Sequence, residues 1–286
     1  ARYFGAKKYN QMGSILKHVM ILAMVFCVTP AAILMLIFAP EILGLMGADE
    51  NVINVGLNYF RIVTIGFIFQ SLSFTVTAAL RGIGETKIPM KNNIIANSCN
   101  VLGNAILIYG MFGFPALGVT GAAISTALSN LIAMGLNIRY ILSGKSVLKL
   151  DFKEKFKFNI NVMRDLVRIG IPTALEQMAL RFGVIMFLKI VSGLGNNVYA
   201  AHQIALNVLS LSYSPAQAFG ITASSLMGQS LGAKNEKLAE RYTKMCQRIG
   251  LALAIMMSAS IYFGATLLTG MYTDNIEIIQ NTVIAL

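Results

Sequence analysis

The stretch IGIPTALEQMALRFGVIMF, residues 169–187, places one carboxylate, Glu176, near the middle of an apolar run. A carboxylate at mid-membrane costs about 2.5 to 3.5 kcal/mol on insertion scales, so it normally faces a cavity and binds or exchanges a cation. Pro172, one helical turn earlier, frees the carbonyl of Arg168 from its hydrogen bond and loosens the helix beside the carboxylate. These residues predict a cation-binding position at Glu176, with a structural ion pair as the alternative.

Arg181 is the obvious partner for such an ion pair, at position i+5 from Glu176. On a helix of 3.6 residues per turn it lies about 140° around the axis, which is poor placement for neutralising Glu176. Lys189 and Arg61 lie near the outer ends of their apolar segments, where long basic side chains reach the membrane interface. We therefore favour the functional interpretation of Glu176 over a partner on another helix.

Amide side chains form a second candidate site. Asn100 and Asn104 are spaced i, i+4, so they share one face of a helix. They predict either a ligand contact or amides that bond across packed helices. Four more polar residues in apolar segments are candidates for lining a cavity or for bonding between helices: Gln70, Gln177, Gln203 and Tyr213.

Cysteine and histidine do not form a metal-binding pattern in this sequence. The residues are isolated, without CxxC or Cys/His spacing: Cys27, Cys99, Cys246, His18 and His202. A phosphate loop, an HExxH motif and a Ser/His/acid arrangement are also absent from the sequence. We expect no enzyme activity and no cofactor.

The elements that position these residues are expected to be membrane helices. Of the 286 residues, 56% are hydrophobic and only 12% are charged, and the mean hydropathy is +0.68. Soluble domains rarely have this composition, and several segments carry the roughly 20 apolar residues that cross a bilayer. We predict an all-α polytopic membrane protein, with a soluble protein built on a strongly apolar helical core as the alternative.

Apolar runs bounded by polar, Gly and Pro positions predict about seven complete spans and the start of another. The predicted helices are 17–39, 54–80, 91–111, 118–142, 165–190, 199–228, 244–268 and 276–286. The small residues of LGVTGAAISTALS, within 117–129, are expected to allow close helix contact.

Basic residues alternate sharply between the connecting segments. Of the 23 basic residues, 20 lie in four segments: 1–17, 81–91, 139–168 and 234–248. The intervening loops, 40–53, 112–117, 191–198 and 269–275, hold none. By the positive-inside rule the basic segments face the cytoplasm, which predicts a multi-pass protein of the cytoplasmic membrane. Topology and contact with the anionic bilayer account for the net charge of +11, so no nucleic-acid partner is expected.

An internal repeat is visible in the sequence. Gly5-Ala6-Lys7 recurs as Gly232-Ala233-Lys234, at an offset of 227. LGLMGADENVINV (43–55) resembles LTGMYTDNIEII (268–279) with Asp49 on Asp274, at an offset of 225. A unit of about 225 residues with six helices implies about 450 residues for two units. We therefore expect a fragment that lacks the first two helices and the last two or more; a complete protein with a degenerate repeat is the alternative.

Three stretches carry a resemblance to a known family. NVYAAHQIALNVLSLSYSPAQAFGITASSLMGQSLGAK (197–234) resembles the eighth helix and following loop of the multidrug and toxic compound extrusion (MATE) family. AALRGIGETKIPMKNNI (78–94) resembles its loop between helices four and five, and NVLGNAILIYGMFGFPALGVTGAAISTALSN (100–130) resembles its fifth and sixth helices.

The resemblance implies two pseudo-symmetric six-helix lobes around a central cavity. On that mapping, residues 1–143 are the part of the N-lobe from the end of helix two to helix six, 144–163 is a cytoplasmic basic linker, and 164–286 is the part of the C-lobe from helix seven to the start of helix ten. The implied function is export of amphipathic, often cationic, small molecules in exchange for Na⁺ or H⁺, by a protein expected to be monomeric.

The resemblance also bears on single residues. The family often carries a Glu in helix seven a few residues after a Pro, and Pro172 and Glu176 match this pattern, with Na⁺ or H⁺ as the coupling ion. In one branch the position of Asn104 is a proton-binding aspartate; an asparagine does not titrate, so the chain is similar to the branch that couples through acids of the second lobe. A lipid-linked oligosaccharide flippase of the same architecture is the alternative function.

Overall fold

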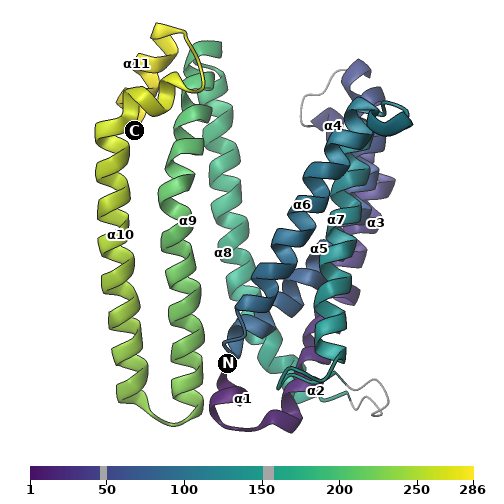
Figure 1. The fold of residues 1–286 in the computed structure, drawn as a ribbon, viewed down its shortest axis with the longest axis vertical. Helices are drawn as coiled ribbons and strands as arrows, with labels where there is room; N and C mark the ends of the chain where they lie inside the picture. The colour runs from purple at the N-terminus through teal and green to yellow at the C-terminus, as the bar shows by residue number, and fades with distance from the viewer. Residues whose placement is uncertain (46–49, 151–157) are drawn as a thin grey trace. The chain divides into compact units, whose positions relative to one another are not determined.

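The computed structural model describes residues 1–45, 50–150 and 158–286, and the regular structure in these ranges is helical (Figure 1). The chain divides into two compact units, residues 1–164 and 165–286. The first unit contains α1 (Arg2–Gly5), α2 (Tyr9–Ile21), the π-helical η1 (Leu22–Val28), α3 (Thr29–Ile37), α4 (Ala39–Leu45), α5 (Glu50–Gly82), α6 (Lys87–Tyr109), the 3₁₀ turn η2 (Met111–Gly113) and α7 (Gly118–Leu142). α8 (Ile160–Ser192) leads into the second unit, which continues with α9 (Asn196–Gly232), α10 (Glu236–Gly270) and α11 (Ile276–Ala285). The predicted all-α class is confirmed.

Four helical runs in the described ranges are long and apolar enough to cross a membrane: Tyr9–Ile37, Val52–Gly82, Gly118–Leu142 and Glu236–Gly270. α6, α8 and α9 are also long, but they carry more polar residues. Asp49, used above to align the repeat, lies outside the described residues, as do Lys153, Lys155 and Lys157 of the predicted linker.

The first run is continuous through α2, η1 and α3, and its middle is widened. Pro30 follows the wide turn; it has no backbone N–H to continue the α-helical bonding pattern and its ring clashes with the carbonyl four residues earlier. The Thr29 N–H instead bonds to the Met24 carbonyl, one residue further back than in an α-helix. The helix therefore continues past Pro30 from η1 into α3.

Small residues bring α6 and α7 together. A Cβ on Gly121 of α7 would overlap the Leu107 carbonyl of α6, and a Cβ on Gly103 of α6 would press on the Ser125 hydroxyl. The Leu117 N–H also donates to the Leu107 carbonyl at 2.9 Å. Close contact through the small residues of 117–129 is thus confirmed, and it holds Asn100 and Asn104 of α6 against α7.

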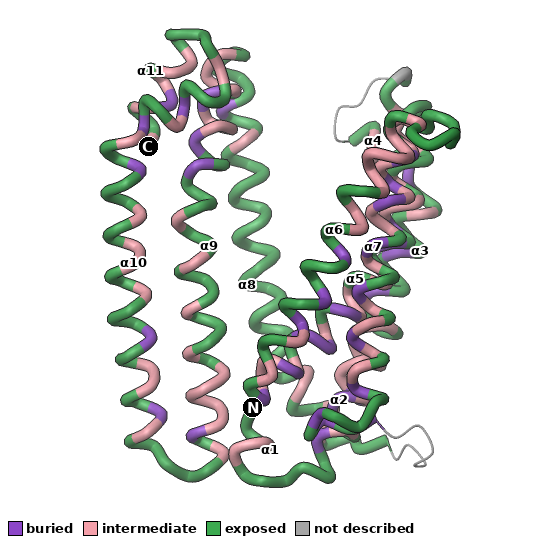
Figure 2. The backbone as a smooth tube through the Cα atoms, in the orientation of Figure 1, coloured by how far each residue is buried: buried purple, intermediate pink, exposed green. Residues whose placement is uncertain are grey.

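The apolar core of the first unit lies where α2, α5 and α7 meet the segment that follows α7. Its buried members are Met12, Leu16, Val76, Leu80, Ile83, Ile141, Leu148 and Leu150. Figure 2 shows such buried positions as a minority on most helices. Large apolar side chains elsewhere are widely exposed, as expected for helices whose outer faces meet lipid.

In the second unit, α9 packs along α10 and its start contacts α11. Asn197 donates to the Glu277 carboxylate at 2.7 Å, and the buried Thr282 hydroxyl lies 3.3 Å from the Ala201 carbonyl. α8 differs from its neighbours because its side chains are almost all exposed; Val191 is its buried residue. Glu176 therefore lies on a helix whose side chains are mostly exposed in the described structure.

The two GAK turns have the same backbone geometry. Lys7 and Lys234 both adopt the left-handed conformation, with φ of 56° and 57°. The Lys7 N–H bonds to Phe4 O at 3.0 Å, and the Lys234 N–H bonds to Leu231 O at 3.1 Å. These bonds are related by the offset of 227, so the structure supports the pseudo-symmetry that the sequence predicts.

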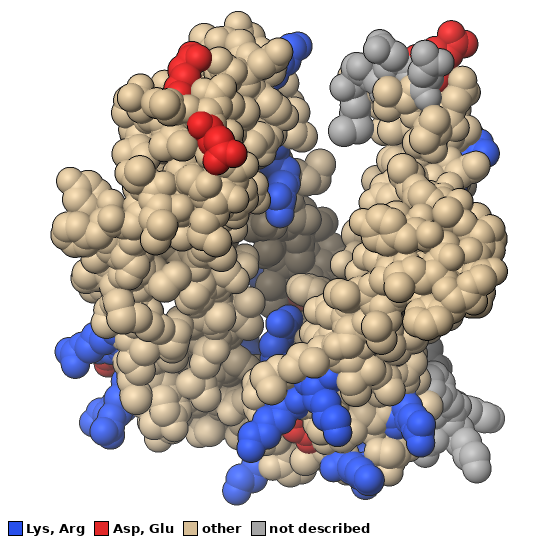
Figure 3. Space-filling model, turned by 45° about the horizontal axis from the view of Figure 1, so that its top comes forward, with Lys and Arg blue, Asp and Glu red and all other residues tan. Residues whose placement is uncertain are grey.

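α2 and α10, the helices that follow these turns, begin eight residues earlier than predicted, at Tyr9 and Glu236 rather than at 17 and 244. The first turn of α2 is polar and that of α10 is charged, so hydropathy alone places the start of each helix only where its apolar run begins. Asn235 caps α10 by accepting a 3.0 Å hydrogen bond from the Leu238 N–H, which explains the early start of that helix. Lysine and arginine side chains gather around the ends of the helices that these turns connect (Figure 3).

Candidate functional site

Asn100 and Asn104 take part in one polar cluster between α6 and α7. The Asn104 side-chain amide donates to Asn100 Oδ1 at 3.2 Å, and the Asn100 amide lies 3.5 Å from Ser125 Oγ and 3.4 Å from Thr126 Oγ1. Ser125 Oγ donates in turn to the Asn100 backbone carbonyl at 2.9 Å. Asn100 therefore bonds across the packed helices to α7, whereas the hydrogen bond of Asn104 stays within α6.

One atom of this cluster has no partner. Asn104 Oδ1 is buried and accepts no hydrogen bond from any group that the structure describes. A buried acceptor without a partner costs about 1 to 3 kcal/mol. Such an oxygen suits a cation, a water molecule or a donor group on a ligand, which keeps the ligand role of Asn104 open.

A second polar cluster, which the sequence analysis did not identify, ties α5, α6 and α7 together. The buried Asn137 accepts a 2.8 Å hydrogen bond from the Asn92 amide and donates to Ser73 Oγ at 2.9 Å and Thr77 Oγ1 at 3.2 Å. Asn137 is fully buried and the other three residues are nearly so. These hydrogen bonds join three packed helices, so the cluster has a structural role.

Glu176 stands in the middle of α8, four residues after Pro172, which lies inside the helix. Its side chain is exposed, and it forms no ion pair with any residue that the structure describes. Arg181, the partner considered from the sequence, is likewise exposed and does not pair with it. The Glu176 carboxylate therefore lies exposed within the apolar run 169–187 of α8.

The remaining candidates are more dispersed. Gln70 on α5, Gln177 on α8 and Tyr213 on α9 are exposed. Gln203 is half-buried, and its amide donates to the Tyr199 hydroxyl one turn earlier on α9 at 3.0 Å. Gln203 thus has a partner within its own helix.

The structure brings only some of these residues together. Asn100 and Asn104 form one cluster in the first unit, while Glu176 and Gln177 are neighbours on α8 in the second unit. Among the predicted site residues, the Glu176 carboxylate forms no ion pair with a described residue, and Asn104 Oδ1 is buried without a hydrogen-bond partner in the described structure. The first is suited to holding a cation, and the second to accepting a hydrogen bond or coordinating an ion.

Comparison with known proteins places these features in a family. A family model described as MatE matches residues 1–106 and 172–286, which include Asn100, Asn104 and Glu176. The chain is 32% identical over 236 residues to "Probable multidrug resistance protein YoeA" of Bacillus subtilis, covering 80% of this chain and 50% of that protein. It is 29% identical over 222 residues to "Probable multidrug resistance protein NorM" of Thermotoga maritima, covering 78% and 47%.

Solved structures show the same fold. A MATE crystal structure in the bent conformation matches with a TM-score of 0.87 at 22% identity, covering 99% of this chain and 62% of that one. A multidrug resistance MATE family transporter in an outward-facing conformation matches with a TM-score of 0.89 at 20% identity and the same coverage. The chain spans about half the length of the two curated relatives, whose multidrug-resistance names do not favour the flippase alternative.

Proposed function

The chain belongs to the multidrug and toxic compound extrusion (MATE) family, and from this membership we propose that the full-length protein is a secondary transporter that exports amphipathic, often cationic, small molecules across the cytoplasmic membrane. The multidrug-resistance names of the relatives support this substrate class. MATE proteins are membrane transporters rather than enzymes. The exporter works as a monomer within the bilayer.

Export is driven by antiport with Na⁺ or H⁺, and Glu176 is the residue that couples the two movements. The observation that carries this assignment is the Glu176 carboxylate in the apolar centre of α8, beside Pro172 and without an ion pair among the described residues. A mid-membrane carboxylate of this kind normally binds or exchanges a cation. Occupancy by the cation and by the substrate is mutually exclusive, which converts the ion gradient into export.

The movement of one coupling ion supplies enough free energy to drive export. Moving one charge through 100 mV contributes about 2.3 kcal/mol, which supports roughly 50-fold accumulation of an uncharged substrate. A Na⁺ or H⁺ concentration gradient adds to this value. The non-titrating amides serve as contacts rather than as ion-exchange groups; Asn104 has the strongest support because its buried Oδ1 is unpaired in the described structure.

Proteoliposomes that contain the full-length protein test the proposal. A fluorescent lipophilic cation is offered as substrate while a Na⁺ gradient and an H⁺ gradient are imposed separately. One gradient should drive transport of the dye, and reversing that gradient should reverse its direction. The absence of dye movement under either gradient, from protein that is correctly inserted, would contradict cation-coupled multidrug export.

A further inference from the structure

The segment after α7, residues 144–150, is a strap that lies across α2. Every second side chain along the strap is buried: Ser146, Leu148 and Leu150. Leu148 and Leu150 belong to the apolar core, and Ser146 Oγ accepts a 3.0 Å hydrogen bond from the Leu148 N–H. The strap is therefore anchored by its buried side chains, and the side chains that alternate with them lie on its outer face.

Gly13 of α2 allows the strap to approach the helix backbone. A Cβ on Gly13 would overlap the Lys149 carbonyl oxygen. The missing side chain thus makes room for the strap and leaves an opening beside it. The outer residues of the strap, Lys145, Val147 and Lys149, are exposed along this opening.

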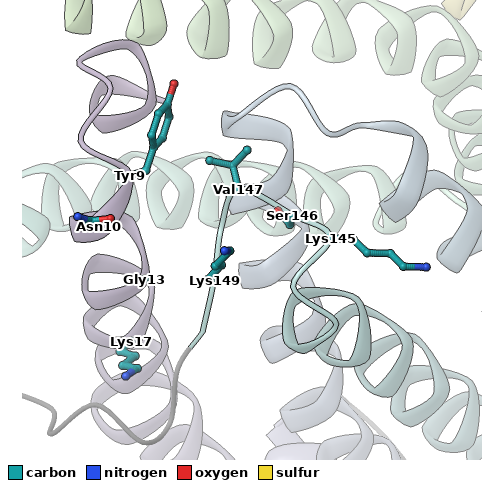
Figure 4. A pocket seen from close by; sticks show the side chains of 8 residues that line it. All are labelled: Tyr9, Asn10, Gly13, Lys17, Lys145, Ser146, Val147 and Lys149. Carbon is teal, nitrogen blue, oxygen red and sulfur yellow. The ribbon is translucent and has the colours of Figure 1, made fainter.

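This opening is a pocket of about 670 Å³ in the first unit. Its lining residues come from α2 and the strap: Tyr9, Asn10, Gly13, Lys17, Lys145, Ser146, Val147 and Lys149. Figure 4 shows Lys17 and Lys149 along the α2 side of the strap and Lys145 extending from its other end. Three lysines and no carboxylate occur among these described lining residues, and neither Lys145 nor Lys149 forms an ion pair with a described residue.

The repeat-related helix of the second unit, α10, differs from α2 at the position of Gly13. At the offset of 227, Lys17 corresponds to Lys244, and Gly13 corresponds to Glu240. Glu240 forms an ion pair with Lys244 on the basic face of α10. The first unit has glycine where the second has the carboxylate, so α2 adds no carboxylate to the described lining of the pocket.

We propose that the pocket between α2 and the strap is a binding site for a phosphate-bearing anion. Lysine ammonium groups form charge-assisted hydrogen bonds with phosphate oxygens, and the Tyr9 hydroxyl and Asn10 amide add neutral donors at the rim. The anion is either an anionic phospholipid headgroup or soluble phosphate. The lipid source fits the position of the pocket, because α2 continues directly into the apolar run Tyr9–Ile37 and basic pockets beside membrane helices bind lipid headgroups.

Binding to the purified full-length protein in a neutral detergent tests this site. Dioctanoyl phosphatidylglycerol, dioctanoyl phosphatidylcholine and inorganic phosphate are titrated separately, and the dissociation constants are measured by calorimetry. The double variant Lys145→Gln/Lys149→Gln is compared with Lys237→Gln/Arg241→Gln, which removes the same charge from the basic face of α10. Val147→Glu, which adds a carboxylate to the pocket lining, serves as a second test.

Phosphatidylglycerol should bind more tightly than phosphatidylcholine, and the pocket double variant should weaken its binding by about tenfold or more, as expected for lost charge-assisted contacts. Val147→Glu should weaken it similarly, and the α10 variant should leave it nearly unchanged. Binding of inorganic phosphate with the same dependence on the pocket lysines would support the site and identify the soluble source. Equal effects of the pocket and α10 variants, or no effect of the pocket variants, would overturn the proposal.

Discussion

At the scale of single residues, the polar groups on the long helices divide into those that bond to one another and those that have no partner among the described residues. Asn92 and Asn137 bond to each other within a buried cluster, and Asn100 bonds across two helices. Glu176 and Asn104 Oδ1 have no such partner among the described residues. A buried polar atom without a partner costs free energy, so a ligand that donates a hydrogen bond to Asn104 Oδ1 would stabilise the protein.

The buried amide cluster predicts a strong contrast between two adjacent asparagines. Asn92→Ala removes the donor to Asn137 Oδ1 and leaves that buried acceptor unpaired. We expect the free energy of unfolding to fall by about 1 to 3 kcal/mol. Asn93→Ala is the matched control, because Asn93 is exposed, and it should change stability by less than about 0.5 kcal/mol. Unfolding by SDS in mixed micelles measures both; equal effects would show that the cluster does not stabilise the fold.

Sequence reasoning predicted some of these residues and missed others for a physical reason. Asn100 and Asn104 were identified because both amides lie on one helix at i, i+4 spacing. Asn92 and Asn137 are 45 residues apart on different helices, so their pairing depends on the packing register of α6 and α7. A sequence pattern contains no information on that register.

At the scale of helices, backbone contact at small residues determines how α6 meets α7. Gly121 leaves room for the Leu107 carbonyl, and this contact positions the face that carries Asn100 and Asn104. Small residues are the common means of close helix packing in membranes. The candidate polar site in the first unit thus depends on glycine positions that are not themselves polar.

Two glycines of α7 test this dependence. Gly121→Ala adds a methyl group that overlaps the Leu107 carbonyl, and overpacking of this kind should lower the free energy of unfolding by about 1 to 3 kcal/mol. Gly135→Ala adds a methyl group to open space on the same helix, and it should be neutral or stabilising by up to about 1 kcal/mol. The same SDS titration measures both. A Gly121→Ala protein as stable as Gly135→Ala would refute the close contact.

The sequence predicted the ends of some helices correctly and the starts of others too late. α7 was predicted as 118–142 and is observed as Gly118–Leu142, because Gly118 and the turn after Leu142 bound one apolar run. α2 and α10 start earlier than predicted, since the polar first turn of α2 and the charged first turn of α10 do not contribute to an apolar pattern. A hydropathy window that detects membrane spans therefore places the start of such helices too late in the sequence.

At the scale of the whole molecule, the repeat and the charge pattern predict one topology. The equivalent turns at Lys7 and Lys234 lie within basic segments of the chain, 1–17 and 234–248, which the positive-inside rule assigns to the cytoplasm. The loop that contains Ala116 has no basic residue, so it is assigned to the opposite side.

Cysteine labelling in intact cells tests this orientation. In a variant without Cys27, Cys99 and Cys246, Ala116→Cys should react with a membrane-impermeant maleimide, because Ala116 is exposed in a loop that the charge pattern predicts to lie outside. Val147→Cys, exposed on the strap, should react only after the cells are permeabilised. Labelling of Val147→Cys in intact cells together with protection of Ala116→Cys would invert the topology.

The central claim is that Glu176 couples cation movement to substrate export, and the most direct measurement separates coupling from substrate passage. Proteoliposomes bearing wild type, Glu176→Gln or Asp165→Asn are assayed for gradient-driven export of a lipophilic cation and for its gradient-free exchange across the membrane. Asp165 is an exposed acid near the start of α8 and serves as the matched control. We predict that Glu176→Gln loses gradient-driven export by at least an order of magnitude and retains exchange, whereas Asp165→Asn resembles wild type in both assays. Gradient-driven export by Glu176→Gln at the wild-type rate would contradict the account.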